Sequence, residues 1–284
     1  MKATDAKKII LIFVLAVGLH LLFLSLASGL IADCRVRGVD DVLCMVLQCF
    51  LKILQFLIPI LIIRLIGGIT FRYEDFPATQ ESPQQLSHSP ILLFAAALGG
   101  MTLLRYIIAG IAHLLQSQHI VLPSASVHYS KTPVGTVLFF LSSVLLPALL
   151  EELFYRSMLL RLLLPCGHVI AIVFTALTFG LMHYYPLSII YAVLIGIILG
   201  YCAIACRSLL LCISLHFCNN LIIFLHDLWP EVEQQALSPF LIIDIILLAG
   251  GLICTGILLR QIMQNRRRHK VDAAQNNAKE GVLR

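Results

Sequence analysis

Long runs of hydrophobic residues, separated by short polar stretches, fill most of this 284-residue sequence. The runs are continuous rather than alternating, so they predict helices and not strands. Most of them reach the roughly 20 residues that a helix needs to cross a hydrocarbon core of about 30 Å, and the fifth is short. We predict eight segments: Ile9–Ala32, Val42–Ile69, Ile91–Leu115, Val134–Leu150 with an apolar continuation to Leu164, Val169–Tyr185, Leu187–Ala205, Ser208–Leu228 and Phe240–Met263.

The composition excludes a soluble or a disordered chain. Hydrophobic residues make up 60% of the sequence and charged residues only 12%, whereas an average soluble domain has about 45–50% and about 25%. So few charges could not cover the surface of a soluble domain. We therefore predict an all-α polytopic membrane bundle of about eight transmembrane helices. It forms a single integral-membrane domain over residues 1–265, followed by a basic tail over residues 266–284 that we expect to be flexible and cytoplasmic.

The distribution of Lys and Arg predicts the orientation of the bundle. With the N-terminus in the cytoplasm, fifteen of the 20 Lys and Arg fall in cytoplasmic segments, and three fall in external loops. Because cytoplasmic loops carry the excess of positive charge, both termini are expected inside, which requires an even number of helices. The acidic stretch after the seventh segment, with Asp227, Glu231 and Glu233, fits the outside. Short loops and the lack of a targeting sequence favour a bacterial plasma (inner) membrane.

Ionisable residues inside the apolar segments are few and fall in groups. Each costs roughly 2.5–3.5 kcal/mol on insertion scales, so each requires a role. In the first group, Glu151-Glu152-Leu153-Phe154-Tyr155-Arg156, two carboxylates interrupt an apolar run. On a helix Glu152 and Arg156 are four residues apart, in the order that favours an ion pair. Glu151 points about 100° away, which leaves it free to act as a general base. The alternative is a charged pair at the cytoplasmic edge of the membrane.

Two further polar groups lie on later segments. Phe179 precedes His183 by one turn near the end of the fifth segment and is placed to pack against its ring. His216 and Asn220 are four residues apart in the seventh segment, so they share one helix face. Such a pair indicates either a polar cavity or a hydrogen bond between helices.

Together, the groups supply a carboxylate, two imidazoles and an amide on three helices. This set can activate a water molecule and stabilise an oxyanion. Glu151, His183 and His216 also meet the minimum for a zinc site, although the His-Glu-x-x-His pattern of common zinc peptidases is absent. Zinc-dependent and metal-free chemistry remain equally open.

These motifs resemble those of the CPBP family of CAAX-protease and bacteriocin-processing membrane peptidases, also called the Abi family, which is related to the type II CAAX prenyl endopeptidases. The family pattern is Glu-Glu-x-x-x-Arg, then Phe-x-x-x-His, then His-x-x-x-Asn, on successive membrane helices. All three motifs occur here in order, as Glu151-Glu152…Arg156, Phe179…His183 and His216…Asn220. The family-like catalytic core would cover about residues 134–228.

The resemblance implies an intramembrane endopeptidase that cleaves a membrane-associated peptide or protein of the CAAX or leader-peptide type. Glu151 would be the base that activates water, with His183 beside it, and His216 and Asn220 would stabilise the oxyanion. A metallo form would use Glu151, His183 and His216 as metal ligands. The supporting residues would be Glu152, Arg156 and Phe179.

This assignment depends on membrane depth. If the fifth helix runs outward from the cytoplasm, His183 falls near its outer end, whereas Glu151 lies toward the inner part of the fourth helix. The two converge if the fourth helix extends well below Glu151, as its apolar continuation to Leu164 indicates, or if the short fifth helix sits low in the membrane.

Other functions use the same residue types. A proton-coupled transporter or channel also needs intramembrane Glu and His, but we find no inverted repeat of the kind that transporters show. A non-catalytic scaffold, or a haem protein with His183 and His216 as ligands, is a further alternative. His20 and His113 are interpreted as packing or interfacial residues. The expected partners are the peptide substrate and the lipid bilayer, without nucleic acid, and the oligomeric state is left open.

Overall fold

The structure is a computed structural model in which residues 3–67, 89–123, 131–228 and 239–282 are described. These residues form helices joined by short turns, and no β-strand occurs among them. The predicted all-α class is confirmed.

The helices follow the order of the predicted apolar runs. Among the described residues, seven helical stretches are long and apolar enough to cross a membrane. The remaining run, predicted over Val169–Tyr185, forms a shorter helix of 14 residues. The bounds are α1 Ala3–Val36, α2 Asp41–Gly67, α3 Pro90–Ser117, a composite stretch Pro133–Cys166, α7 His168–Leu181, α8 Pro186–Cys206, α9 Leu209–Leu228 and α10 Pro239–Val282.

The composite stretch is one helical path of 34 residues with changes of winding along it. Two π-helical segments flank the short helix that carries the two adjacent glutamates. π-Helical turns are rare and occur frequently at functional sites. Its parts are α4 Pro133–Phe140, η2 Leu141–Leu145, α5 Leu146–Glu152, η3 Leu153–Leu160, α6 Arg161–Leu163 and η4 Leu164–Cys166.

Local sequence sets several of the helix boundaries. Proline occupies the first turn of α3, α4 and α8, where its missing N–H needs no partner and its fixed φ suits a helix. Thr132 caps α4 by accepting a hydrogen bond from the Gly135 N–H at 3.1 Å. Gly167 has a φ of +112° in the turn between η4 and α7, a conformation that favours glycine.

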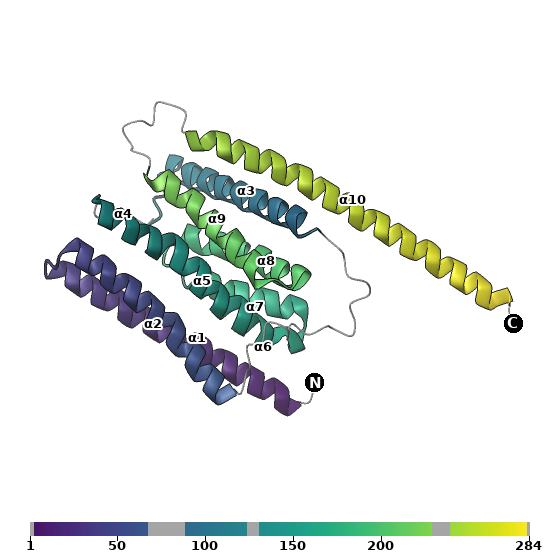
Figure 1. The fold of residues 1–284 in the computed structure, drawn as a ribbon, viewed down its shortest axis with the longest axis horizontal. Helices are drawn as coiled ribbons and strands as arrows, with labels where there is room; N and C mark the ends of the chain where they lie inside the picture. Colours follow the sequence, from purple (N-terminus) through teal and green to yellow (C-terminus); the bar gives the residue numbers. More distant parts are fainter. Residues whose placement is uncertain (1–2, 68–88, 124–130, 229–238, 283–284) are drawn as a thin grey trace.

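Successive helices run in alternating directions through the bundle. Figure 1 shows that α1 begins and α10 ends at the same end, which we call the N/C end. The opposite end, called the far end, holds the turn between α1 and α2 and the end of α9 at Leu228. Which end faces the cytoplasm stays a prediction. Beyond the last span, α10 continues as a helix through the basic segment to Val282, so residue 266 is not a break in secondary structure.

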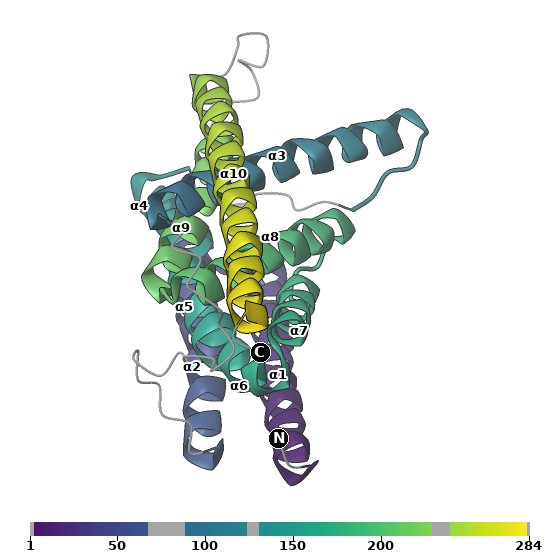
Figure 2. The ribbon, with the colours of Figure 1, turned by 90° about the vertical axis from the view of Figure 1, so that its right-hand side faces the viewer.

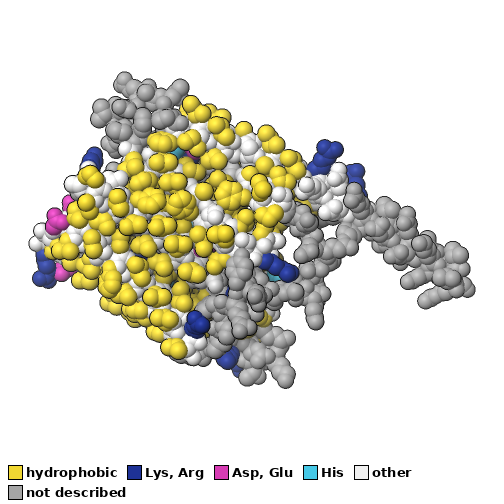
Figure 3. Space-filling view, viewed as in Figure 1, with side chains coloured by type: hydrophobic (Ala, Val, Ile, Leu, Met, Phe, Trp, Pro, Cys, Tyr) yellow, Lys and Arg dark blue, Asp and Glu magenta, His cyan; other side chains and the backbone are white. Residues whose placement is uncertain are grey.

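The surface between the two ends is largely hydrophobic. Figure 3 shows apolar side chains covering most of the visible face of the bundle. Large apolar side chains such as Leu11, Leu114 and Ile246 are 69%, 62% and 63% exposed. So large an exposed apolar surface is unfavourable in water, whereas contact with lipid chains carries no such cost. The protein is therefore an integral membrane protein.

A buried polar cluster connects α10 to the bundle. Asp244 of α10 is fully buried and pairs with Arg105. It also accepts hydrogen bonds from Tyr106 Oη at 2.6 Å and from His226 Nε2 at 3.0 Å. Because α3 and α9 supply these partners, the charge of Asp244 is balanced without water.

Two glycines allow α3 and α10 to cross closely. Figure 2 shows α3 crossing α10 at a steep angle. A Cβ atom on Gly99 would lie 2.5 Å from Gly251 Cα, and one on Gly251 would lie 2.6 Å from Gly99 Cα. Small residues at such crossings let helix backbones approach in a membrane.

We expect Gly99→Leu to destabilise the protein by about 1–3 kcal/mol, because the added side chain would have to displace the α10 backbone. The measurement is the thermal unfolding midpoint of the purified protein in detergent. Gly110→Leu is the matched control on the same helix, since no atom lies within 4 Å of a Cβ placed there. Equal midpoints for the two variants would contradict this account of the crossing.

Candidate active site

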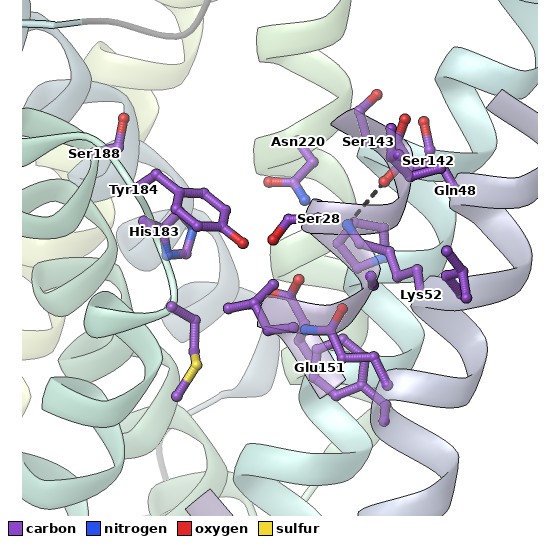
Figure 4. Close-up of a pocket in the computed structure, with 18 of the residues that line it drawn as sticks. Ser28, Gln48, Lys52, Ser142, Ser143, Glu151, His183, Tyr184, Ser188 and Asn220 are labelled. Carbon is purple, nitrogen blue, oxygen red and sulfur yellow. Dashed lines mark hydrogen bonds between the residues drawn. The ribbon is translucent and has the colours of Figure 1, made fainter. Parts of the chain in front are cut away.

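A cavity of about 810 Å³ lies between α1, α2, the composite stretch, the turn between α7 and α8, and α9. Figure 4 shows polar side chains facing it from several helices. Three of the four predicted catalytic residues line this cavity, namely Glu151, His183 and Asn220. The fourth, His216, is not among its lining residues.

The hairpin around Gly167 brings Glu151 and His183 to the same depth. Each lies sixteen residues from Gly167 along the chain. The two arms of the hairpin pack against each other, so equal distances from the turn mean similar heights. The helical stretch continues to Cys166, well below Glu151, and α7 ends early at Leu181. The first of the two conditions for convergence, a fourth helix that extends well below Glu151, is therefore met. Glu151 and Glu152 lie near the middle of the 34-residue stretch, which argues against the alternative placement at the membrane edge.

Pro147 and the π-helical turn before it create a further polar contact in the cavity wall. The N–H of Leu146 bonds to the Leu141 carbonyl, five residues back. In that register the Ser142 carbonyl would pair with the N–H of residue 147, which proline lacks. Lys52 Nζ donates a hydrogen bond to this carbonyl instead, at 3.0 Å. The ammonium group of Lys52 is thereby held at the cavity, where it interacts electrostatically with Glu151.

Glu152 is the fixed member of the glutamate pair. Its side chain is fully buried, and Oε1 accepts hydrogen bonds from Arg156 Nη1 at 2.9 Å and from His216 Nδ1 at 2.7 Å. Because a carboxylate oxygen accepts, Nδ1 of His216 carries the hydrogen. The predicted pair of Glu152 and Arg156 is confirmed. Arg156 is also buried, so the sequence-based count was wrong to include it, and the basic residues assigned to the expected cytoplasmic segments number fourteen rather than fifteen.

Glu151 is the free member of the pair. Its side chain is 15% exposed, and it makes no hydrogen bond to any other described residue. His216 Nε2 lies 3.9 Å from Glu151 Oε2. The ring of His216 therefore lies between the two carboxylates, with Nδ1 toward Glu152 and Nε2 toward Glu151.

Phe179 forms the aromatic centre of the site. Its ring centroid lies 5.4 Å from that of His183, 5.8 Å from that of His216 and 5.1 Å from that of Tyr155. The guanidinium carbon of Arg156 lies 4.8 Å from the ring centroid, within cation–π distance. The predicted packing of Phe179 on His183 is confirmed.

The backbone fixes the tautomer of His183. Nδ1 lies 3.1 Å from the Phe179 carbonyl oxygen, which can only accept a hydrogen bond, so Nδ1 carries the hydrogen in the neutral ring. Nε2 is left as an acceptor. Figure 4 shows His183, in the turn after α7, and Glu151, on α5, lining the same cavity.

A chain of hydrogen bonds orients Asn220. Tyr191 Oη donates to Asn219 Oδ1 at 2.7 Å, and Asn219 Nδ2 donates to Asn220 Oδ1 at 3.3 Å. Since the carbonyl oxygen of Asn220 is engaged, its amide N–H groups are the donors available to the cavity. Asn219 thus links Tyr191 to Asn220 and holds the Asn220 side chain in this orientation.

Several residues of the site were not predicted. Lys52, Gln55 and His20 reach the cavity from α1 and α2, and His20 packs on Phe154 with ring centroids 4.8 Å apart. The hydroxyl of Tyr155 is buried without a hydrogen-bond partner among the described residues. The available signal was the presence of Lys52 and His20 in long apolar runs, where polar residues mark functional sites.

The arrangement does not form a three-ligand metal site. Among the described residues, no group of three or more His, Cys, Asp or Glu side chains is placed to hold a metal ion. Glu151 and His216 are close, with Nε2 of His216 toward Glu151 and Nδ1 bonded to Glu152, but His183 does not complete a group of three with them. The proposed ligand set of Glu151, His183 and His216 therefore does not fit a metal as these side chains stand.

The central part of the chain is similar to a known protein family. Residues 133–222 match the family model described as type II CAAX prenyl endopeptidase Rce1-like. No curated protein and no solved structure gave a match. The matched range nearly coincides with the core expected at about residues 134–228 and contains all three motifs. Over this segment the chain is similar to the type II CAAX prenyl endopeptidases, which supports the resemblance to the CAAX-protease (CPBP) family.

Proposed function

We propose that this protein is an intramembrane endopeptidase that hydrolyses a peptide bond of a membrane-associated substrate, with Glu151 as the base that activates water. One contrast carries the proposal. Two adjacent carboxylates lie at mid-depth, and one is locked by Arg156 and His216 while the other faces a cavity without a hydrogen bond to a described residue. A partly buried carboxylate that makes no hydrogen bond and faces a polar cavity is suited to general-base work.

The reaction would proceed by proton transfer through Glu151. Glu151 takes a proton from water as the water oxygen attacks the substrate carbonyl carbon. The carbonyl oxygen becomes an oxyanion. When the C–N bond breaks, Glu151 returns the proton to the leaving nitrogen, so that one amine and one carboxylic acid are released.

The surrounding residues would orient the water and stabilise the charge. The acceptor Nε2 of His183 can hold the attacking water across the cavity from Glu151. The amide of Asn220 can donate to the oxyanion. His216, held by Glu152, lies beside the reacting carboxylate, with Nε2 3.9 Å from Glu151 Oε2. This differs from the expected pairing of His216 with Asn220, because His216 lies beside Glu151 and not on the cavity wall.

The proposal also concerns the substrate class and the membrane in which the protein resides. The family supports a CAAX-type substrate, and a leader peptide fits the same chemistry. We place the protein in a bacterial plasma membrane with both termini in the cytoplasm, on the bias of Lys and Arg toward the N/C end.

The decisive test is hydrolysis by the purified protein in vesicles. Quenched membrane-proximal peptides would be incubated in water enriched in ¹⁸O, with and without a zinc chelator. A hydrolase places ¹⁸O in the new carboxylate, which mass spectrometry detects. Proton-coupled flux without cleavage would favour the transporter alternative. Chelator sensitivity would favour the metallo form over the metal-free one.

We expect Asn220→Ala to lower kcat by about 10²–10³, the usual loss for one oxyanion donor. The fold should be kept, because Asn220 is the last acceptor in the series of hydrogen bonds that runs from Tyr191 through Asn219. Asn265→Ala, at an exposed position of α10, is the control. A kcat within twofold of the wild type for Asn220→Ala would remove Asn220 from the mechanism.

A further inference from the structure

The cavity deepens from an exposed rim at the far end to a buried floor. Its lining residues at the rim, Ser28, Arg35 and Asp227, are exposed. Its lining residues on the floor, Tyr155 and Phe179, are 1% and 3% exposed. The direction of opening is thus away from the end where α1 begins and α10 ends (Figure 1).

The two ends of the bundle differ strongly in charge. When each segment is assigned to the helix ends it joins, fourteen Lys and Arg belong to the N/C end and three to the far end. Each end carries six Asp and Glu, so the difference between the ends lies in their Lys and Arg. The remaining basic residues, Lys52, Arg105 and Arg156, lie within the bundle and are paired there with Ser142, Asp244 and Glu152.

The charge difference between the two ends indicates the side of the membrane to which the cavity opens. Positive residues in short loops remain in the cytoplasm, which assigns the N/C end to that compartment. The far end then lies on the other side of the membrane. The cytoplasmic C-terminal tail of a substrate would reach the N/C end. The cavity rim at Ser28, Arg35 and Asp227 lies at the far end.

The depth of the cavity suits a short extended stretch of substrate. Along α9 the cavity extends from Asn220 to Asp227, about 10 Å of helix. An extended chain covers that depth in about three residues. A short extended stretch therefore suffices to carry a peptide bond from the rim to the level of Asn220.

We propose that the cavity admits an extended stretch of a membrane-anchored polypeptide from the non-cytoplasmic side, and that cleavage occurs on that side. The direction of opening stands on the charge distribution and the cavity rim alone, whereas the cleavage rests on the proposed function. The substrate class is then a protein whose cleavable segment emerges from the outer face of the membrane, near its anchor.

The direction is tested by single-cysteine labelling without any measurement of activity. Ser28→Cys at the rim and Asn265→Cys at the N/C end would be placed singly in a chain whose nine native cysteines are replaced. A membrane-impermeant maleimide is added to right-side-out and inside-out vesicles. We expect at least tenfold more label on Ser28→Cys in right-side-out vesicles and on Asn265→Cys in inside-out vesicles. The reverse pattern, or labelling of both from one side, overturns the proposal.

If the cysteine-free chain does not fold, the native chain gives the same information. Trypsin should cleave the basic segment at Arg266–Arg268 in inside-out vesicles and leave it intact in right-side-out vesicles, and the opposite result overturns the direction. A membrane-impermeant quenched peptide then tests the side of cleavage, with Glu151→Gln as the blank. Cleavage only in right-side-out vesicles supports the proposal, and cleavage only in inside-out vesicles overturns it. Cleavage in neither orientation counts against the proposed function, while the labelling still decides the direction.

Discussion

Glu151→Gln is expected to lower kcat by about 10²–10⁴, the contribution typical of a general base. Glutamine keeps the size of the side chain and its ability to hydrogen-bond, but its amide does not accept a proton from water. Since Glu151 makes no hydrogen bond to another described residue, the substitution removes no hydrogen bond within the described part of the protein. The loss should therefore appear in kcat with KM nearly unchanged, the pattern of an interaction made in the transition state.

The measurement is the initial rate of peptide cleavage by purified variants over a range of substrate concentrations. Asp33→Asn is the matched control, because it removes one carboxylate of an exposed pair at the far end, 2.7 Å from Arg37. The thermal midpoints of both variants should agree with that of the wild type. Cleavage at the wild-type rate by Glu151→Gln would exclude Glu151 as the base and the proposed mechanism with it.

The helices could be predicted from the sequence because hydrophobic length is a direct consequence of bilayer thickness. The predicted runs begin and end within a few residues of the observed helices in most cases. The fourth run shows the limit of this reasoning. Hydropathy placed its core at Val134–Leu150 and treated the rest as a continuation, whereas the helical stretch is continuous to Cys166. Charged residues at mid-depth lowered the local hydropathy without ending the helix, since their charges are paired.

The same limit explains the uncertainty about depth. A sequence gives distances along one helix but not the height of one helix relative to another. Gly167 resolves this, because it makes the turn that sets Glu151 and His183 at equal distances along two packed arms. The signal was present in the sequence as a glycine between two apolar runs, but its meaning depended on where the fourth helix ended.

Helical spacing distinguished the two glutamates but did not identify their partners on other helices. The four-residue spacing identified Glu152 as the partner of Arg156. It could not show that His216, from a segment about sixty residues later, binds Glu152 as well. Contacts between distant segments depend on how the helices are arranged around the cavity. For the same reason, Lys52 and His20, far from the family motifs in the sequence, were not predicted as parts of the site.

The buried pair of Glu152 and Arg156 should be the most sensitive structural element of the site. We expect Arg156→Met to destabilise the protein by about 3–5 kcal/mol, because removal of one partner leaves an uncompensated buried charge. Glu152 would keep only His216 as a hydrogen-bond donor, and one of its oxygens already has no hydrogen-bond partner in the described part of the chain.

The chain offers a matched control for this prediction. Asp33 and Arg37 form a second carboxylate–Arg pair with the same four-residue spacing, but their side chains are 52% and 73% exposed. Arg37→Met should therefore change the stability by no more than about 1 kcal/mol. The free energy of unfolding would be measured for both variants in mixed detergent micelles. The double variant Glu152→Gln/Arg156→Met, which removes both charges, should be more stable than Arg156→Met alone. If Arg156→Met and Arg37→Met were equally stable, Arg156 would not be needed to balance the charge of Glu152, and Glu152 could not be the fixed member of the pair that leaves Glu151 free.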